Sequence, residues 1–120
     1  MNKTTVVLGA STNEGRYSYL AVRQLWKHNH SVVAIGRKKG EIGDVKIITE
    51  SPVIENVHTV TLYLKPENQV EYYHYILSLN PKRIIFNPGT ENDELLEMAI
   101  KNGIEATEAC TLVMLSTNQY

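Results

Sequence analysis

Residues 4–18 constrain the fold most, because they read as a buried strand, a small polar turn and the start of a helix. The strand ends in Gly9-Ala10-Ser11, which leaves almost no side chain at its carboxyl end. A ligand can therefore approach the backbone, and the helix that begins near Ser18 aims its free N–H groups at the same place. Such a turn suits a phosphate group. An ordinary strand-to-helix loop is the alternative, since the turn lacks the G-x-G-x-x-G dinucleotide pattern.

Strands and helices alternate along the rest of the chain. We expect strands at residues 31–35, 58–64, 83–86 and 104–107, a helix at residues 66–79, and another from Thr90 to Gly103 with Thr90 and Asp93 as a capping pair. Residues 45–48 would suit a short edge strand, and the tail from residue 110 a short helix.

This alternation predicts an α/β fold for residues 1–120, a single domain of three layers. A mostly parallel five-stranded sheet would carry helices on both faces, joined by right-handed crossovers. The turns after the first four strands would then meet at one edge of the sheet, where proteins of this architecture bind ligands.

The composition limits the classes of ligand and the location that we expect. The 120 residues carry a formal net charge of -1, so no basic excess indicates nucleic acid. The single cysteine, Cys110, excludes an internal disulfide and a cysteine-cluster metal site. We see no targeting leader and no apolar run that would cross a bilayer, and therefore expect a cytoplasmic protein that does not bind membranes.

The turn after the second predicted strand is basic. Proteins that bind NAD usually place a carboxylate there for the ribose hydroxyls, whereas this chain has Arg37, Lys38 and Lys39. A phosphate on the ribose is implied, which fits either the 2′-phosphate of NADP or the 3′-phosphate of coenzyme A. A solvated basic loop is the alternative, and we favour it for Lys39.

The chain resembles a known family: small stand-alone coenzyme A-binding proteins similar to the amino-terminal part of the succinyl-CoA synthetase alpha subunit. The resemblance covers nearly the whole chain. Its most specific part is the motif G-A-S-x-N-x-x-R-x-S, seen here as Gly9, Ala10, Ser11, Asn13, Arg16 and Ser18. The chain departs from the family pattern at Glu14, at Gly36-Arg37-Lys38 and at Thr111, where the family has proline, Asn-Pro-Lys and proline.

The resemblance implies a Rossmann-like CoA-binding domain whose cofactor is coenzyme A or an acyl-CoA. The diphosphate would lie on the N–H groups between Ser11 and Ser18, and the 3′-phosphate would meet the basic turn. The adenine would lie between the loops at Gly36 and Leu64-Pro66, with the pantetheine directed toward Asn87-Pro88-Gly89. The expected cofactor contacts are Gly9, Ala10, Ser11, Asn13, Arg16, Tyr17, Ser18, Gly36, Arg37, Lys38, Leu64, Pro66, Asn87, Pro88 and Gly89.

We find no catalytic group in the sequence and therefore favour a binding protein over an enzyme. None of the four histidines has a supporting partner in the pattern, and no pair of carboxylates stands out. Cys110 follows the last predicted strand, where a packing role is the more common one for a free cysteine. The alternative is a mixed disulfide between Cys110 and coenzyme A.

The leading interpretation is a non-catalytic carrier, sensor or regulator that binds coenzyme A. An NADP-type dinucleotide-binding protein is one alternative, and an interaction module with a vestigial nucleotide site is another. The predicted helix 66–79 has apolar residues over nearly its whole circumference, more than one sheet face can bury. We therefore expect a homodimer through residues Tyr72–Leu79 of this helix.

Overall fold

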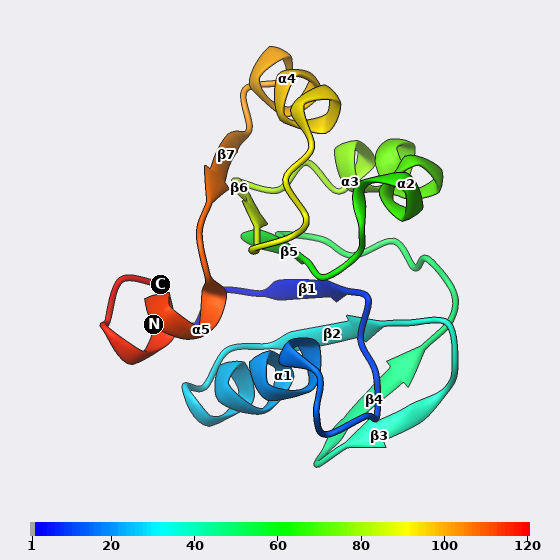
Figure 1. The fold of residues 1–120 in the computed structure, drawn as a ribbon, viewed down its shortest axis with the longest axis vertical. Coiled ribbons are helices and arrows are strands. Elements are labelled where there is room, and N and C mark those ends of the chain that lie inside the picture. The colour runs from blue at the N-terminus through cyan, green and yellow to red at the C-terminus, as the bar shows by residue number, and fades with distance from the viewer. Residues whose placement is uncertain (1) are drawn as a thin grey trace.

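The computed structural model describes residues 2–120, which form an α/β fold around a seven-stranded sheet (Figure 1). The strands lie in the order β3-β4-β2-β1-β5-β6-β7, and every neighbouring pair is parallel except β3 with β4. The strands are β1 Thr5–Leu8, β2 Val32–Ile35, β3 Gly40–Ile42, β4 Val45–Ile48, β5 Thr59–Leu62, β6 Arg83–Phe86 and β7 Glu105–Glu108.

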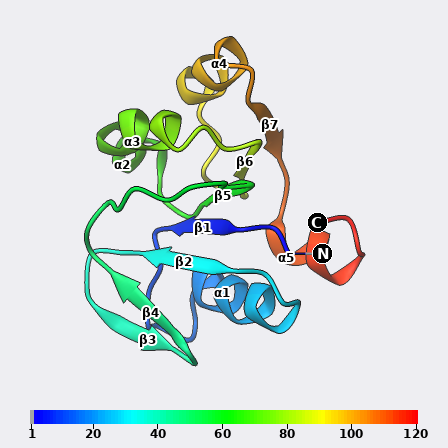
Figure 2. The same cartoon turned by 180° about the vertical axis from the view of Figure 1, so that it is seen from behind.

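Helices cover both faces of this sheet (Figures 1 and 2). The helical elements are α1 Tyr17–Lys27, α2 Pro66–Gln69, the 3-10 turn η1 Val70–Tyr72, α3 Tyr73–Ser78, α4 Asp93–Lys101 and α5 Thr111–Ser116. On one face Val7 of β1 lies in a buried cluster with Leu25 of α1 and Leu115 of α5. On the other face Leu8 lies in a cluster with residues of α3 and α4. The predicted three-layer, mostly parallel architecture is therefore confirmed.

The predicted count of five strands is wrong, because residues 40–48 add an antiparallel hairpin at one end of the sheet. Ile42 is opposite Val45, and the two-residue turn between them contains Gly43 at φ 58°. The sequence indicated β4 but not β3, which has only three residues. A Cβ atom at Gly40 would lie 2.4 Å from Cγ2 of Thr12, so the hairpin starts in close contact with the turn after β1.

The helix expected at residues 66–79 is divided into α2, η1 and α3. Its tyrosines Tyr72, Tyr73 and Tyr75 are half-buried and pack against the core cluster, and Leu79 is buried. Within this helical region Val70 is the large apolar residue that stays exposed. The broad bare surface on which the homodimer was predicted is therefore largely covered by the chain's own core.

Helix α4 has its N-cap two residues after the predicted cap, Thr90. Its N-cap is Asn92, whose side-chain oxygen accepts hydrogen bonds from the N–H groups of Glu94 (3.1 Å) and Leu95 (3.2 Å). The predicted capping pair of Thr90 and Asp93 is wrong, because the Thr90 hydroxyl donates to the carbonyl of Asn87 instead. The predicted end is confirmed, since Gly103 has φ 72° directly after the helix.

Candidate functional site: a cationic cleft at the carboxyl ends of the strands

The turns after β1, β2 and β5 pack directly on one another at the carboxyl edge of the sheet. The N–H groups of Gly9 and Ala10 both donate to the carbonyl of Ile35, each at 2.9 Å. Gly9 has φ 96°, and a Cβ atom there would lie 2.8 Å from the carbonyl oxygen of Tyr63. A Cβ atom at Gly36 would lie 2.3 Å from the carbonyl oxygen of Ala10. The convergence of turns expected from the sequence therefore depends on two glycines with no room for a side chain.

The turn between β1 and α1 is held by short-range hydrogen bonds. The N–H of Asn13 donates to the Ser11 hydroxyl (3.0 Å), and the N–H of Gly15 donates to the Asn13 side-chain oxygen (2.9 Å). Arg16 is the N-cap of α1, and its side chain caps none of the N–H groups. The amino end of α1 thus keeps N–H donors for another group, as the sequence predicted for an anion site.

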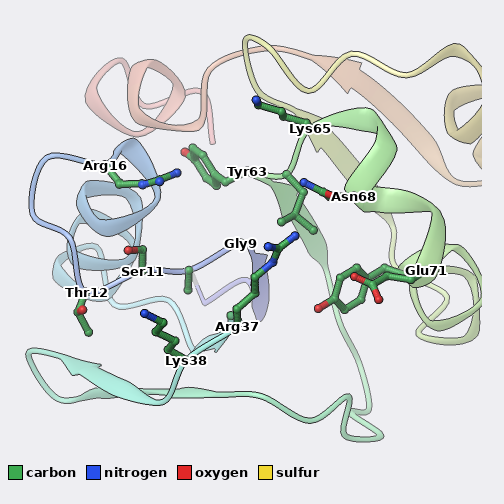
Figure 3. A pocket seen from close by; sticks show the side chains of 14 residues that line it. Gly9, Ser11, Thr12, Arg16, Arg37, Lys38, Tyr63, Lys65, Asn68 and Glu71 are labelled. Carbon is green, nitrogen blue, oxygen red and sulfur yellow. The ribbon is translucent and has the colours of Figure 1, made fainter.

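A cleft of about 450 Å³ opens between these turns (Figure 3). This volume lies within the roughly 300–1,000 Å³ typical of small-molecule sites. We call it the first cleft, and its lining residues are Gly9, Ala10, Ser11, Thr12, Arg16, Gly36, Arg37, Lys38, Tyr63, Leu64, Lys65, Asn68, Glu71 and Tyr72. Eight of the predicted contact residues line it, namely Gly9, Ala10, Ser11, Arg16, Gly36, Arg37, Lys38 and Leu64.

Positive charge dominates the first cleft although the whole chain is slightly acidic. Arg16, Arg37, Lys38 and Lys65 contribute cations to the lining, whereas Glu71 contributes the carboxylate. Figure 3 shows Arg37 and Lys38 rising from the end of β2, with Arg16 facing them from the start of α1. An arrangement of this kind favours a ligand with more than one anionic group.

A second cleft, also of about 450 Å³, lies beside the first. Its lining residues are Gly9, Asn13, Gly15, Arg16, Tyr17, Ser18, Tyr63, Lys65, Pro88, Gly89 and Thr90. It brings in five further predicted residues, namely Asn13, Tyr17, Ser18, Pro88 and Gly89. The two clefts share Gly9, Arg16, Tyr63 and Lys65, so they adjoin one another.

Two residues that line the second cleft have buried hydroxyl groups without a hydrogen-bond partner among the described residues. These groups are the hydroxyls of Ser18, which is 3% exposed, and of Tyr63. Burial raises the pKa of the Tyr63 phenol above its ordinary value. An unsatisfied buried hydroxyl costs free energy.

Two predicted contact residues lie outside both clefts. Pro66 begins α2 and lines neither cleft. The Asn87 side chain is buried, and its amide nitrogen donates to the Thr61 hydroxyl (2.7 Å) and the Leu62 carbonyl (2.9 Å). Its side-chain oxygen accepts the N–H of Thr111 at 2.9 Å. The polar atoms of Asn87 therefore join β5, β6 and α5.

The sequence interpretation missed several lining residues. Tyr63 and Lys65 follow β5, while Asn68, Glu71 and Tyr72 come from the helical region after it. Asn68 and Glu71 are three positions apart, which places them on one side of a helix, and this spacing is the signal that the sequence offered.

Residues with catalytic or metal-binding chemistry are not gathered at these clefts. His28, His30 and His58 lie at the amino-terminal edge of the sheet, and His74 is exposed on α3. Cys110 is half-buried as the N-cap residue of α5. Within residues 2–120 no group of three or more His, Cys, Asp or Glu side chains is placed to hold a metal ion.

The helices of the structure are short. None of those in residues 2–120 has both the length and the apolar content required to cross a membrane.

Known structures share this fold over most of their length. A crystal structure of an uncharacterized protein is 55% identical to this chain, with a TM-score of 0.97, and the match covers 100% of this chain and 99% of that one. A hypothetical protein from Pyrococcus horikoshii OT3 is 21% identical with a TM-score of 0.86, over 96% of this chain and 82% of that one. A protein from Thermus thermophilus is 19% identical with a TM-score of 0.85, over 98% and 90% of the two chains. At these low identities, the Pyrococcus and Thermus proteins show similarity of fold alone.

Among curated protein sequences no match is found. Among protein families, the family described as "CoA binding domain" matches residues 3–116 of this chain. The resemblance inferred from the Gly9–Ser18 motif is thereby confirmed, and the chain belongs to the CoA binding domain family.

Proposed function

We propose that this protein binds coenzyme A or an acyl-coenzyme A through the diphosphate and the 3′-phosphate, without catalysing a reaction. One observation carries the proposal: the first cleft joins the uncapped amino end of α1 to the cations of the β2 turn. Coenzyme A has two phosphate centres in one molecule, and the cleft has two separate places that suit an anion. Membership of the CoA binding domain family supports the same ligand.

The diphosphate is assigned to the turn between Gly9 and Ser18. The bare strand end allows backbone N–H groups to approach phosphate oxygens, and the dipole of α1 adds partial positive charge there. Arg16 lines both clefts and can neutralise the diphosphate from the α1 side.

The 3′-phosphate is assigned to Arg37 and Lys38. Both side chains are exposed at the end of β2, so a phosphate can reach them without prior movement of the core. Charge-assisted hydrogen bonds from a guanidinium and an ammonium are strong and salt-dependent. Lys39 is exposed beside them and lines neither cleft, which supports the expectation that it is solvated.

The pantetheine arm is assigned to the second cleft, where Pro88 and Gly89 form part of the wall. The roles of carrier, sensor or regulator fit this arrangement, because the cleft walls supply phosphate-binding groups and no paired acid, base and nucleophile. Residues 1–120 would act as a single binding domain. A homodimer through Tyr72–Leu79 remains a prediction, and light scattering at micromolar protein concentration tests it.

Calorimetry with coenzyme A and with dephospho-coenzyme A tests the assignment. We expect coenzyme A to bind at least about tenfold more tightly, since a phosphate paired with charged donors contributes roughly 1.5–3 kcal/mol. Equal affinity for the two ligands would remove the role of the Arg37-Lys38 pair. Fluorescence titration with NADPH distinguishes the alternative, because tighter binding of NADPH than of coenzyme A would favour a dinucleotide-binding protein.

A further inference from the structure

The two clefts meet at a junction that carries two cations. The residues shared by both clefts are Gly9, Arg16, Tyr63 and Lys65. Arg16 directly precedes α1, whereas Lys65 directly precedes α2, so the two charges come from different turns. The other cations of the site, Arg37 and Lys38, line the first cleft alone. Arg16 and Lys65 are therefore the positive side chains that the two clefts have in common.

The backbone is held on both sides of Lys65. The carbonyl of Leu64 accepts a hydrogen bond from the side-chain amide of the fully buried Gln69 at 2.8 Å. The carbonyl of Lys65 itself accepts the N–H of Asn68 at 2.9 Å. Pro66 follows, and its ring restricts its own φ angle. The turn after β5 therefore presents the lysine side chain from a fixed position beside the junction.

This turn packs directly on the turn that is proposed to hold the diphosphate. The N–H of Tyr63 donates to the carbonyl of Leu8 at 2.9 Å, and a Cβ atom at Gly9 would lie 2.8 Å from the carbonyl oxygen of Tyr63. Figure 3 shows Lys65 extending from the turn after β5 and Arg16 from the start of α1, with Tyr63 between them in this view. Lysine has three N–H donors on a flexible stem, so it can meet a phosphate oxygen without a fixed orientation.

The order of these groups along the clefts matches the order of the parts of coenzyme A. In coenzyme A the diphosphate joins the 3′-phosphorylated adenosine to the pantetheine. The two ends are assigned above to Arg37-Lys38, in the first cleft alone, and to Pro88-Gly89, in the second cleft alone. A ligand that extends between these places has its diphosphate at the junction. Its phosphate oxygens would there meet a cation from each side, which is more favourable than pairing with one.

We propose that Lys65 binds the diphosphate of coenzyme A from the side opposite Arg16. This inference rests on the proposed function, and it adds a charged binding residue from the turn after β5, where the sequence interpretation expected contacts from Leu64 and Pro66. The alternative is an exposed lysine that is solvated, as proposed for Lys39.

Calorimetry with coenzyme A and dephospho-coenzyme A, on the unmodified protein and on Lys65→Gln, tests the inference. Both ligands contain the diphosphate, and coenzyme A alone has the 3′-phosphate. We therefore expect Lys65→Gln to weaken the binding of both ligands by the same factor, about tenfold. Lys65→Arg should retain most of the affinity, because it keeps the positive charge. A residue that contacts the 3′-phosphate would instead affect coenzyme A alone.

The matched control is Lys82→Gln. Lys82 is exposed at the opposite edge of the sheet, directly before β6, and it lines neither cleft. The substitution removes the same charge and should leave both affinities unchanged. A melting temperature equal to that of the unmodified protein shows that each variant is folded.

Three results overturn the inference while the proposed coenzyme A binding stands. The first is an unchanged affinity of Lys65→Gln for both ligands. The second is a loss of affinity for coenzyme A alone, which would place Lys65 at the 3′-phosphate. The third is an equal loss in Lys82→Gln and Lys65→Gln, because the effect would then reflect net charge. Failure of the unmodified protein to bind either ligand overturns both proposals.

Discussion

The guanidinium of Arg83 lies 4.5 Å from the centroid of the Tyr120 ring, at the sheet edge opposite the two clefts. Arg83 is 7% exposed, and its Nε donates to the Thr59 hydroxyl at 2.9 Å, while one terminal nitrogen has no partner among the described residues. The Tyr120 ring also lies against His30, and its hydroxyl is hydrogen-bonded to that of Thr5. A cation that is buried without a carboxylate is costly, and the aromatic face offsets part of that cost.

Replacing Tyr120 by alanine should therefore lower the free energy of unfolding by about 3 kcal/mol, through loss of buried aromatic contact. Tyr120→Phe is the matched control, and it should cost only about 1 kcal/mol, because the ring remains and one hydrogen bond is lost. Urea denaturation measures both. Equal losses in the two variants would show that the hydroxyl, and not the ring over Arg83, provides the stabilisation.

Acid should destabilise the edge of the sheet opposite the two clefts, where Arg83 and Tyr120 lie. Burial lowers the pKa of His30 from its ordinary value of 6.5, and nearby positive charges, including that of Lys3, lower it further. The pKa of His58 is also lowered, first by burial and then by the positive charge of Arg83. Nδ1 of His30 accepts the N–H of Lys3 at 2.9 Å, so the folded state favours the neutral ring. Below pH 6.5 the unfolded state binds more protons than the folded state, and stability falls as the pH falls toward the lowered values.

Thermal unfolding between pH 7.5 and 5 checks this dependence. The variant His30→Gln/His58→Gln should show a smaller decrease of the melting temperature across this interval. The control is His28→Gln/His74→Gln, which changes two exposed histidines. If the two double variants follow the same pH profile, the histidines at this edge are not the source of the acid sensitivity.

Gly9→Ala should reduce both stability and ligand binding. The added methyl group would meet the carbonyl oxygen of Tyr63 at 2.8 Å, and alanine is strained at φ 96°. Gly103→Ala provides the comparison, since Gly103 has φ 72° with open space around it. We expect about 1 kcal/mol of destabilisation at Gly103 and at least about 1 kcal/mol more at Gly9. Similar values from urea denaturation would mean that the turns after β1 and β5 move apart easily.

Arg37→Ala should weaken coenzyme A binding by about tenfold and leave dephospho-coenzyme A binding nearly unchanged. The loss should shrink as salt is raised, because the proposed interaction is between exposed charges. Lys39→Ala, at the same basic turn, is the control and should retain the affinity for both ligands. A variant Arg37→Ala that loses affinity equally for both ligands would place its contact away from the 3′-phosphate.

Two of the strands that the sequence revealed are buried on both faces. Val60–Leu62 of β5 and Ile84–Phe86 of β6 are fully covered, and a continuous apolar run is what such strands require. Strand β3 was missed because Gly40–Ile42 contains one buried apolar residue, and its turn reads Gly43-Asp44 instead of the common Asn-Gly or Asp-Gly.

The site was predictable where it depended on local composition. Gly9-Ala10-Ser11 and Arg37-Lys38 stand at strand ends, and both lie in the first cleft. Asn68 and Glu71 were not found, because their place is set by Gln69, which bonds to Thr90 twenty-one positions away. A local sequence pattern cannot indicate a contact between residues so far apart in the chain.

The contact between Gly40 and Thr12 makes the β3–β4 hairpin the outer wall of the turn that follows β1. At its tip, Gly43 has open space around it. A fluorophore attached through Asp44→Cys, at the exposed residue beside Gly43, with Cys110 replaced by serine, would lie on an element that contacts the turn after β1, and Asp44 lines neither cleft. The hairpin thus offers an attachment point for an optical sensor of the proposed ligand.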